Sequence, residues 1–328
     1  MSKKTVIILL GAWLFTGLAA QNNRIIVHDP VAIAADGAYY MFSTGRGIAS
    51  WTSDDKLNWH YLGRVFNDIP AWCKQEVPKF DGNIWAPDIS FHNGKYYLYY
   101  SISSFASNRS AIGVATNMTL DTASTDYAWV DHGMVVESVA GRDHYNAIDP
   151  HLVMDEEGSP WLSFGSFWGG MKLVQMNDDL LSVAEPEQWA TIATRERTFG
   201  LDAEDPGDGA IEAPFIVKKD GYYYLFVSFD LCCRGARSTY NVRVGRSESI
   251  TGPYLDRDGV SMEQGGGTLV VEGDENYYGV GHNSVYQFDD GWYMYSHGYD
   301  RHHNGRPRLV IHRVHWDAEG WPGVEEIK

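Results

Sequence analysis

The sequence has little cysteine and little positive charge for a chain of 328 residues. Its three cysteines, Cys73, Cys232 and Cys233, are too few for a disulfide framework and lack the spacing of a zinc site. The adjacent pair forms either a vicinal disulfide or two thiols, and the sequence leaves both open. Lysine and arginine number 26 against 43 aspartates and glutamates, a net charge of −17. This charge argues against a nucleic acid or an anionic membrane surface as a partner.

Long hydrophobic runs are equally scarce, since the sequence has only one, at its N-terminus. Lys3 and Lys4 precede an apolar stretch that runs to Ala20 and ends in small residues. This pattern is typical of a secretory signal peptide, and ~16 apolar residues are few for a membrane span. We predict a cleaved signal over residues 1–20, with a retained anchor as the alternative. Residues 21–328 are predicted to be a single domain that is secreted or periplasmic and free of the membrane.

Aromatic residues and glycine are abundant, at 14% of the chain and 34 residues respectively. Five segments align on a shared glycine that follows an acidic or amide residue and precedes a run rich in aromatic residues. Each segment has the pattern of a β-hairpin with a tight turn. The shared glycines, 57 to 70 residues apart, are Gly37, Gly94, Gly158, Gly221 and Gly291.

More strands follow most of these hairpins, and no long amphipathic helix is evident. Third and fourth strands are predicted at residues 47–53, 59–63, 111–116, 127–133, 171–176 and 242–247. Four short strands in each of five units predict an all-β fold, a five-bladed β-propeller. The first strand of each blade would line the central channel and start at one mouth. Residues 27–28 and 309–316 are predicted to lie in a shared or adjacent blade where the ring closes.

The residues just before the first strands include several acids. Asp29, Asp149 and Glu212 stand at matched positions in different predicted blades. A fourth copy has Asp88 one position inside its strand, and the fifth has His282. One aspartate before proline is explained by turn formation, but three acids at one mouth are costly to bury unless they are used.

Acids gathered in this way suit glycoside hydrolysis. That reaction needs one protonated carboxyl group for the leaving oxygen and one ionised carboxylate to activate water or attack carbon. A third negative charge nearby raises the pKa of the acid. Aromatic side chains near the predicted mouth add platforms for stacking of sugar rings. They are Trp85, Phe105, Phe167 and Trp168, of which Phe167 and Trp168 belong to a glycine-rich loop that we expect to be exposed.

Seven stretches, taken in order, resemble glycoside hydrolase family 43, and within it the arabinanases. They span essentially the whole mature chain and are residues 28–30, 83–88, 146–151, 163–170, 209–215, 230–235 and 281–284. The resemblance implies that Asp29 is the general base and Glu212 the general acid, and that Asp149 orients the acid and tunes its pKa. It also implies that Asn146 and Ser166 contact the substrate, together with the four aromatic residues.

The same resemblance implies an inverting enzyme that cleaves α-1,5-linked L-arabinan of plant pectin, and it favours an endo-acting enzyme over an exo-acting one. Base and acid should then stand about 6.5–9.5 Å apart, which leaves room for the attacking water. The resemblance further implies a calcium ion in the channel with His282 as its sole protein ligand and water as the rest. Calcium prefers oxygen ligands, so an ordinary hydrogen-bonded channel histidine is the alternative.

Two other functions stay open. One is an exo-acting arabinofuranosidase or a β-xylosidase of the same family, although the extra β-sandwich of many family xylosidases is not evident. The other is a propeller that binds sugar without cutting it, which three convergent acids argue against. Residues 300–307, rich in histidine and arginine, match nothing in the resemblance and can shape one end of the cleft. No coiled-coil pattern suggests assembly, so we expect a monomer.

Overall fold

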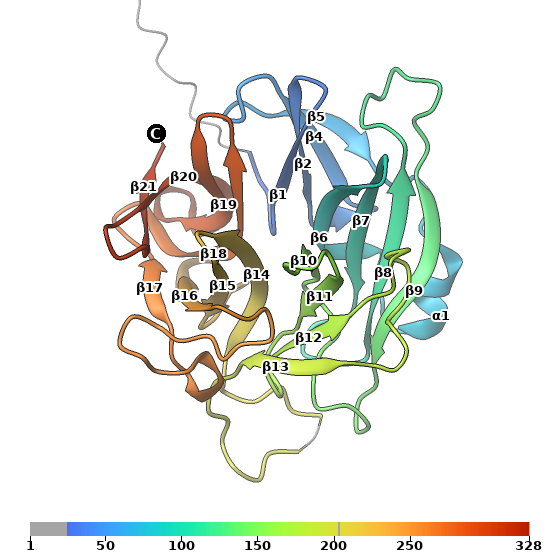
Figure 1. The fold of residues 1–328 in the computed structure, drawn as a ribbon. Coiled ribbons are helices and arrows are strands. Elements are labelled where there is room, and N and C mark those ends of the chain that lie inside the picture. Colours follow the sequence, from blue (N-terminus) through green and yellow to red (C-terminus); the bar gives the residue numbers. More distant parts are fainter. Residues whose placement is uncertain (1–24, 203, 328) are drawn as a thin grey trace, which may run out of the picture.

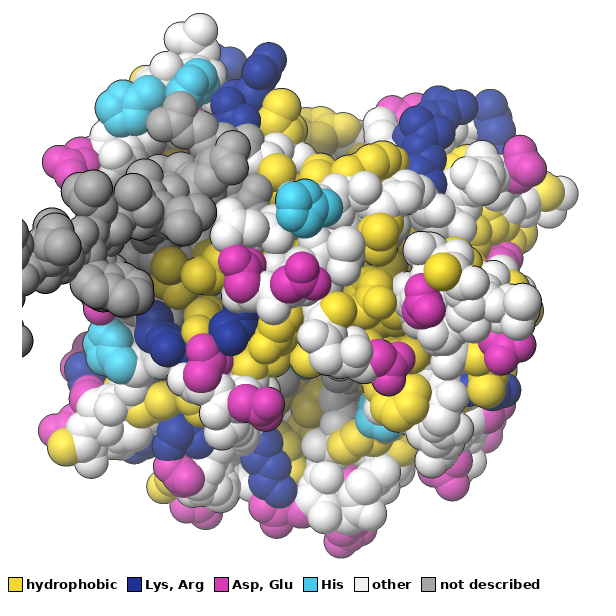
Figure 2. Space-filling view, turned by 90° about the horizontal axis from the view of Figure 1, so that it is seen from above, with side chains coloured by type: hydrophobic (Ala, Val, Ile, Leu, Met, Phe, Trp, Pro, Cys, Tyr) yellow, Lys and Arg dark blue, Asp and Glu magenta, His cyan; other side chains and the backbone are white. Residues whose placement is uncertain are grey.

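The computed structural model describes residues 25–202 and 204–327, which are built mainly from β-strands (Figure 1). The predicted signal peptide lies outside these residues. Within them, no helix is long and apolar enough to cross a membrane. On the face seen in Figure 2, acidic side chains are interspersed with basic and neutral ones rather than gathered in one field.

The strands form five antiparallel sheets, called blades 1 to 5 in chain order. Blade 1 contains β1 (Val31–Ala35), β2 (Ala38–Ser43), β4 (Ala49–Ser53) and β5 (His60–Arg64). Blade 2 contains β3 (Gly45–Arg46), β6 (Asn83–His92), β7 (Lys95–Ile102), β8 (Ser110–Asn117) and β9 (Val130–Ser138). Blade 3 contains β10 (His151–Met154), β11 (Pro160–Phe164), β12 (Met171–Gln175) and β13 (Trp189–Ala193).

Blade 4 contains β14 (Ile211–Lys219), β15 (Tyr222–Phe229), β16 (Asn241–Ser247) and β17 (Thr268–Val271). Blade 5 contains β18 (Tyr277–Phe288), β19 (Gly291–Asp300), β20 (Arg306–Trp316) and β21 (Pro322–Glu326). The helical turns are short: α1 (Ala71–Glu76), η1 (Gly235–Arg237), η2 (Met262–Gln264) and η3 (Arg301–His303). The predicted third and fourth strands are present, although β9 begins and ends later than expected.

The blades close into a ring around a central channel. The first strands contact one another in the order β1, β6, β10, β14 and β18, and β18 in turn contacts β1. Figure 1 shows the five sheets following one another around this centre. The predicted five-bladed β-propeller is therefore confirmed, with the first strand of each blade innermost.

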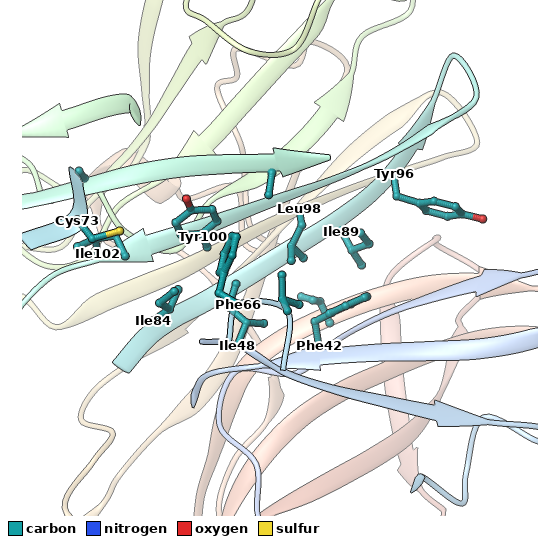
Figure 3. Close-up of a cluster of buried hydrophobic side chains, with 14 of the residues drawn as sticks. Phe42, Ile48, Phe66, Cys73, Ile84, Ile89, Tyr96, Leu98, Tyr100 and Ile102 are labelled. Atoms are coloured by element: carbon teal, nitrogen blue, oxygen red, sulfur yellow. The ribbon is translucent and has the colours of Figure 1, made fainter. Parts of the chain in front are cut away.

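Each interface between neighbouring blades is filled by its own cluster of buried hydrophobic side chains. Figure 3 shows the cluster between blades 1 and 2, where Phe42, Ile48 and Phe66 face Ile84 and Leu98. These side chains are almost fully buried, and burial of one such side chain stabilises the fold by about 1.5–3 kcal/mol. The blades thus hold one another and fix the distances between their inner strands.

Three of the five hairpin turns have the residues and geometry expected from the sequence. Asp36-Gly37, Asn93-Gly94 and Asp220-Gly221 all have positive φ, near 50° at the first residue and near 80° at the second. This is the type I′ turn that matches the twist of a hairpin. The fifth hairpin turns at residues 289–290, with Gly291 already paired to Phe288. The alignment on Gly291 is therefore wrong by one residue in blade 5.

The two ends of the described chain meet between blades 5 and 1. The N–H of Leu309 in β20 donates to the carbonyl of Ile25 at 3.1 Å. Val27 packs in the cluster that joins blade 1 to β19 and β20. Blade 5 takes all four strands from the C-terminal part of the chain. Residues 309–316 belong to β20 of that blade, and residues 27–28 precede β1 of the adjacent blade 1, so the two stretches do not share a blade.

Candidate active site

The same backbone irregularity occurs near the start of every inner strand. Two residues of the first strand stand opposite one residue of the second strand, as in a β-bulge, and the first of the two has positive φ. These residues, with φ between 39° and 59°, are Asp29, Ala86, Asp149, Ala213 and His282. Positive φ in residues other than glycine costs about 1 kcal/mol or more, so surrounding contacts must hold it. His282 is thus the blade 5 equivalent of Asp29.

The N–H groups of these residues are held from the preceding blade. In four blades the acceptor is a side chain at the end of the preceding blade's second strand. The pairs are Ala86 with Thr44 Oγ1 at 2.8 Å, Asp149 with Ser101 Oγ at 2.9 Å, His282 with Ser228 Oγ at 2.8 Å, and Asp29 with His297 Nδ1 at 3.2 Å. The ring of blades therefore fixes the backbone from which the acidic side chains project.

The fifth N–H, that of Ala213, is held by Asp149. The equivalent position at the end of the second strand in blade 3 is Gly165, which has no side chain to accept a hydrogen bond. A Cβ there would lie 2.8 Å from the carbonyl oxygen of Gly170, so the position excludes one. Asp149 Oδ2 accepts the Ala213 N–H at 3.1 Å instead. One acid of the cleft thereby fixes the backbone beside another, Glu212.

Asp29 is surrounded by donors and imidazoles. The Thr44 hydroxyl donates to Oδ2, and His282 Nδ1 lies 3.0 Å from Oδ1. Burial raises the pKa of Asp29, but the neighbouring histidines, His282 foremost, and the Thr44 hydroxyl outweigh it and bring the pKa to about 2. Asp29 is therefore ionised at all but very acidic pH, which is the state that a general base needs.

Glu212 has the opposite tendency. Burial raises its pKa, although the hydrogen bonds from Tyr240 Oη to Oε1 at 2.6 Å and from Ser166 Oγ to Oε2 at 2.8 Å oppose this. Burial and the charges of Glu212 and Asp29 raise the pKa of Asp149 well above its usual value. Two neighbouring buried carboxyl groups cannot both ionise freely, so the pair keeps a proton beside an ionised Asp29.

All the residues predicted from the sequence to act, bind sugar or hold metal line one cleft of about 460 Å³. They are Asp29, Trp85, Phe105, Asn146, Asp149, Ser166, Phe167, Trp168, Glu212 and His282. The aromatic residues differ in availability, because Phe105 is 78% exposed whereas Trp168 is only 5% exposed. Ser166 is engaged with Glu212, and Asn146 Oδ1 accepts the Ser110 hydroxyl at 2.6 Å. The cleft thus gathers the predicted set, and the individual roles stay predictions.

Asp88, the acid one position inside its strand, is not a cleft residue. Its carboxylate accepts the Leu152 N–H at 2.9 Å and lies 3.1 Å from His151 Nδ1, while His151 Nε2 donates to the Ile216 carbonyl at 2.9 Å. These residues come from blades 2, 3 and 4. Asp88 therefore ties three inner strands together below the site.

The sequence analysis missed a layer of side chains beneath the acids. His28 packs on His297, with ring centroids 4.3 Å apart, and His297 Nε2 lies 3.1 Å from Tyr299 Oη. Tyr240, the partner of Glu212, is also in contact with His297. The sequence held one signal for this layer, since the aromatic second strands carry a hydroxyl residue near their ends in several blades and His297 at the equivalent position in blade 5.

The two adjacent cysteines form a disulfide and line the cleft. Cys73, the remaining cysteine, is buried. The segment at 300–307 is not among the residues that line the cleft. It packs behind the disulfide instead, because Gly305 lies against Gly235 and Ala236 of η1 with no room for a side chain.

Two groups of side chains near Asp29 are candidate ligands for a metal ion. His28, Asp29 and His297 bring one donor atom each within 4.8 Å of one another. Both nitrogens of His297 are engaged, however, one by the Asp29 N–H and one by Tyr299. His282 differs, because its Nδ1 faces Asp29 and its Nε2 makes no hydrogen bond within the described part of the chain. A metal-binding histidine commonly donates its other N–H to a carboxylate, so His282 fits that role.

Comparison with known proteins agrees with this geometry. Residues 24–322 match the family described as glycosyl hydrolases family 43. The chain belongs to that family. This family 43 chain is 50% identical over 315 residues to the extracellular exo-α-(1→5)-L-arabinofuranosidase ArbA of Cellvibrio japonicus, with 96% of this chain and 91% of the relative covered.

Endo-acting relatives are similar as well. The family 43 chain is 40% identical over 301 residues to extracellular endo-α-(1→5)-L-arabinanase 1 of Bacillus subtilis, with 90% of this chain and 87% of the relative covered. A solved structure of Cellvibrio cellulosa α-L-arabinanase complexed with arabinohexaose superposes with a TM-score of 0.91 at 50% identity. The match covers 92% of this chain and 96% of that one. The family 43 chain is thus a glycoside hydrolase whose relatives include both exo- and endo-acting enzymes.

Proposed function

We propose that the protein is an extracellular, monomeric enzyme that hydrolyses α-1,5-linked L-arabinan by endo attack with inversion. The observation that carries this proposal is the pairing, in one cleft, of an ionised Asp29 with a Glu212 whose pKa is raised. Extracellular arabinan-degrading relatives support the substrate and the location. A cleaved signal over residues 1–20 would deliver the enzyme to the outside.

In this mechanism the three acids divide the work. Glu212 gives its proton to the leaving glycosidic oxygen as the bond from that oxygen to the anomeric carbon breaks. Asp29 takes a proton from the water whose oxygen forms the new bond to that carbon on the opposite face. Asp149 holds the backbone beside Glu212 and, as the second buried carboxyl group of the pair, helps to keep a proton there for the acid. One water is consumed, and each product chain ends in a hydroxyl group.

An exo-acting enzyme is the second candidate, because the relative of 50% identity is named as exo-acting. The test is a time course of products from linear α-1,5-arabinan, analysed by chromatography, with xylan oligosaccharides as the comparison substrate. Endo attack gives oligosaccharides of mixed length early, whereas exo attack releases one short product throughout. Tight binding of arabino-oligosaccharides with no product over hours would instead indicate a sugar-binding propeller, and preferential cleavage of the xylan substrate would indicate a xylosidase.

The alkaline limb of the pH profile tests the assignment of Glu212. Tyr240→Phe removes a hydrogen bond that stabilises the ionised form of Glu212, so the pKa of Glu212 should rise further. The acid then stays protonated to higher pH, and the alkaline limb of kcat/KM on arabinan should move to higher pH. Tyr254→Phe is the matched control, because the Tyr254 hydroxyl is equally buried but donates to the distant Ile250 carbonyl. An unmoved limb in Tyr240→Phe would contradict the role of Glu212.

The channel ion belongs to the proposal too. His282 would hold a calcium ion through Nε2, with water as most of its shell, and the ion's charge would favour the ionised form of Asp29. The neighbouring Asn283 supports a hydrated site, because its buried amide oxygen and nitrogen find no partner among the described residues. We expect exhaustive chelation with EDTA to lower the melting temperature and kcat, and His282→Ala to abolish that sensitivity. An enzyme that chelation leaves unchanged would speak against the ion.

A further inference from the structure

The disulfide in the cleft wall has a second face that points away from substrate. Cross-linking two adjacent cysteines closes a small ring that contains the peptide bond between them. The N–H of Cys233 belongs to that peptide bond, so the ring fixes its direction. This N–H donates to Tyr299 Oη at 2.7 Å, and Tyr299 is 1% exposed. One side of the ring therefore faces the cleft and the other side is anchored in the core.

Tyr299 continues the contact to Asp29. Its Oη lies 3.1 Å from His297 Nε2, and His297 Nδ1 lies 3.2 Å from the backbone nitrogen of Asp29. The chain of hydrogen bonds thus runs from the ring through two buried side chains of β19 to the residue proposed as general base. It joins segments far apart in the sequence.

The positions of the protons follow from the donors at each end. A backbone N–H can only donate, so His297 Nδ1 accepts from Asp29 and the ring proton of His297 stands on Nε2, facing Tyr299. Tyr299 Oη then accepts from His297 and from Cys233. The same hydroxyl also contacts Cys233 Sγ at 3.7 Å and is hydrogen-bonded to the Ser238 side chain.

The acceptor at the Asp29 N–H differs from the acceptors at the equivalent N–H groups of the other blades. At the equivalent N–H groups, Thr44, Ser101 and Ser228 accept through short hydroxyl side chains. At Asp29 alone the acceptor is an imidazole whose second nitrogen passes the contact onward. Asp29 also keeps φ at 55°, a conformation that needs support.

We propose that the Cys232–Cys233 ring positions the general base, acting through Tyr299 and His297 on the backbone of Asp29. This inference rests on the proposed function only for the role of Asp29 as base. His297 and Tyr299 are positioning residues, since neither is proposed to touch the reacting atoms. Opening the ring frees the Cys233 N–H, loosens Tyr299 and lets Asp29 drift from the attacking water.

The first test is Tyr299→Phe, which removes the oxygen that joins the ring to His297. Because small misplacements of a catalytic group are costly, we expect kcat on linear arabinan to fall about tenfold while KM changes less than about twofold. The matched control is Tyr295→Phe on the same strand, whose hydroxyl donates to the Lys56 carbonyl at 3.0 Å, away from the cleft. We expect the control to keep its kcat.

The second test is a double-mutant cycle with the variant Cys232→Ala/Cys233→Ala. If the ring acts through Tyr299, kcat falls by a similar factor in this variant, and adding Tyr299→Phe lowers it little further. KM is free to change in the cysteine variant because the pair lines the cleft. Losses that multiply would overturn the proposal, and so would a Tyr299→Phe variant with the kcat of the wild type.

Hydrogen exchange gives a readout that needs no activity. The amide of Asp29 should exchange faster in Tyr299→Phe and in the cysteine variant than in wild type or Tyr295→Phe, measured by mass spectrometry on the peptide that contains it. If the wild-type protein does not cut arabinan, the proposed function is wrong, and the exchange rates still test whether the hydrogen bonds connect the ring to Asp29. Unchanged exchange of the Asp29 amide in both variants would overturn the proposal that the ring positions Asp29.

Discussion

Replacing Glu212 by glutamine is expected to lower kcat on arabinan by about 10²- to 10⁴-fold, which is the usual contribution of a general acid. Glutamine keeps the shape of the side chain, and its oxygen accepts from one of the Tyr240 and Ser166 hydroxyls while its NH2 group donates to the other, so the fold should survive. What it loses is the proton for the leaving oxygen. The measurement is steady-state hydrolysis of linear arabinan together with the melting temperature.

The leaving group separates loss of the acid from loss of the base. A nitrophenyl glycoside of arabinotriose releases an acidic phenol that needs little protonation, so Glu212→Gln should retain far more activity on it than on arabinan. A base variant should lose activity on both substrates. Glu157→Gln, at an exposed position in the loop between β10 and β11, is the control for the substitution itself. Turnover of arabinan near that of wild type in Glu212→Gln would reject the assignment.

The repeats in the sequence were sufficient to predict the propeller. Four of the five inner strands have proline after the residue of positive φ, and three hairpins have Asp-Gly or Asn-Gly at the turn. Both signals depend only on neighbouring residues, so they can be recognised in a single sequence. Blade 5 lacks the proline, and its Gly291 follows the turn instead of forming it. The alignment there slipped by one residue, and only the pairing of β18 with β19 corrects it.

The layer beneath the acids could not be predicted in the same way. Its members, such as Tyr240 and His297, lie on strands whose aromatic pattern is fully accounted for by core packing. Their hydrogen bonds to Glu212 and Asp29 depend on how the blades are placed against each other. The cysteine pair was undecided for a different reason, because the sequence permits the thiols and the disulfide equally.

Replacing Asp29 by asparagine is expected to lower kcat by about 10²- to 10⁴-fold on arabinan and on the activated arabinotriose glycoside alike. Asparagine fits the same space and tolerates positive φ, so the backbone should keep its bulge. It cannot take the proton of the attacking water. The measurement is kcat on both substrates, with the inverted configuration of the product followed by NMR in the wild type.

The control for this substitution is Asp36→Asn, in the turn between β1 and β2, where φ is 50° and asparagine is as well suited as aspartate. It should keep full activity. If Asp29→Asn turned over arabinan at a rate close to that of this control, Asp29 would not be the base.

Stability has to be measured beside activity, because Asp29 also stabilises the fold. Its pKa is about 2 in the folded protein and about 3.9 in an unfolded chain. The ionised carboxylate therefore contributes stability above the unfolded value, and this contribution is lost as the pH falls through the folded value. Asp29→Asn should consequently lower the free energy of unfolding at neutral pH and change it little near pH 2. A kcat loss in an enzyme that is still folded at the assay pH then reports on catalysis alone.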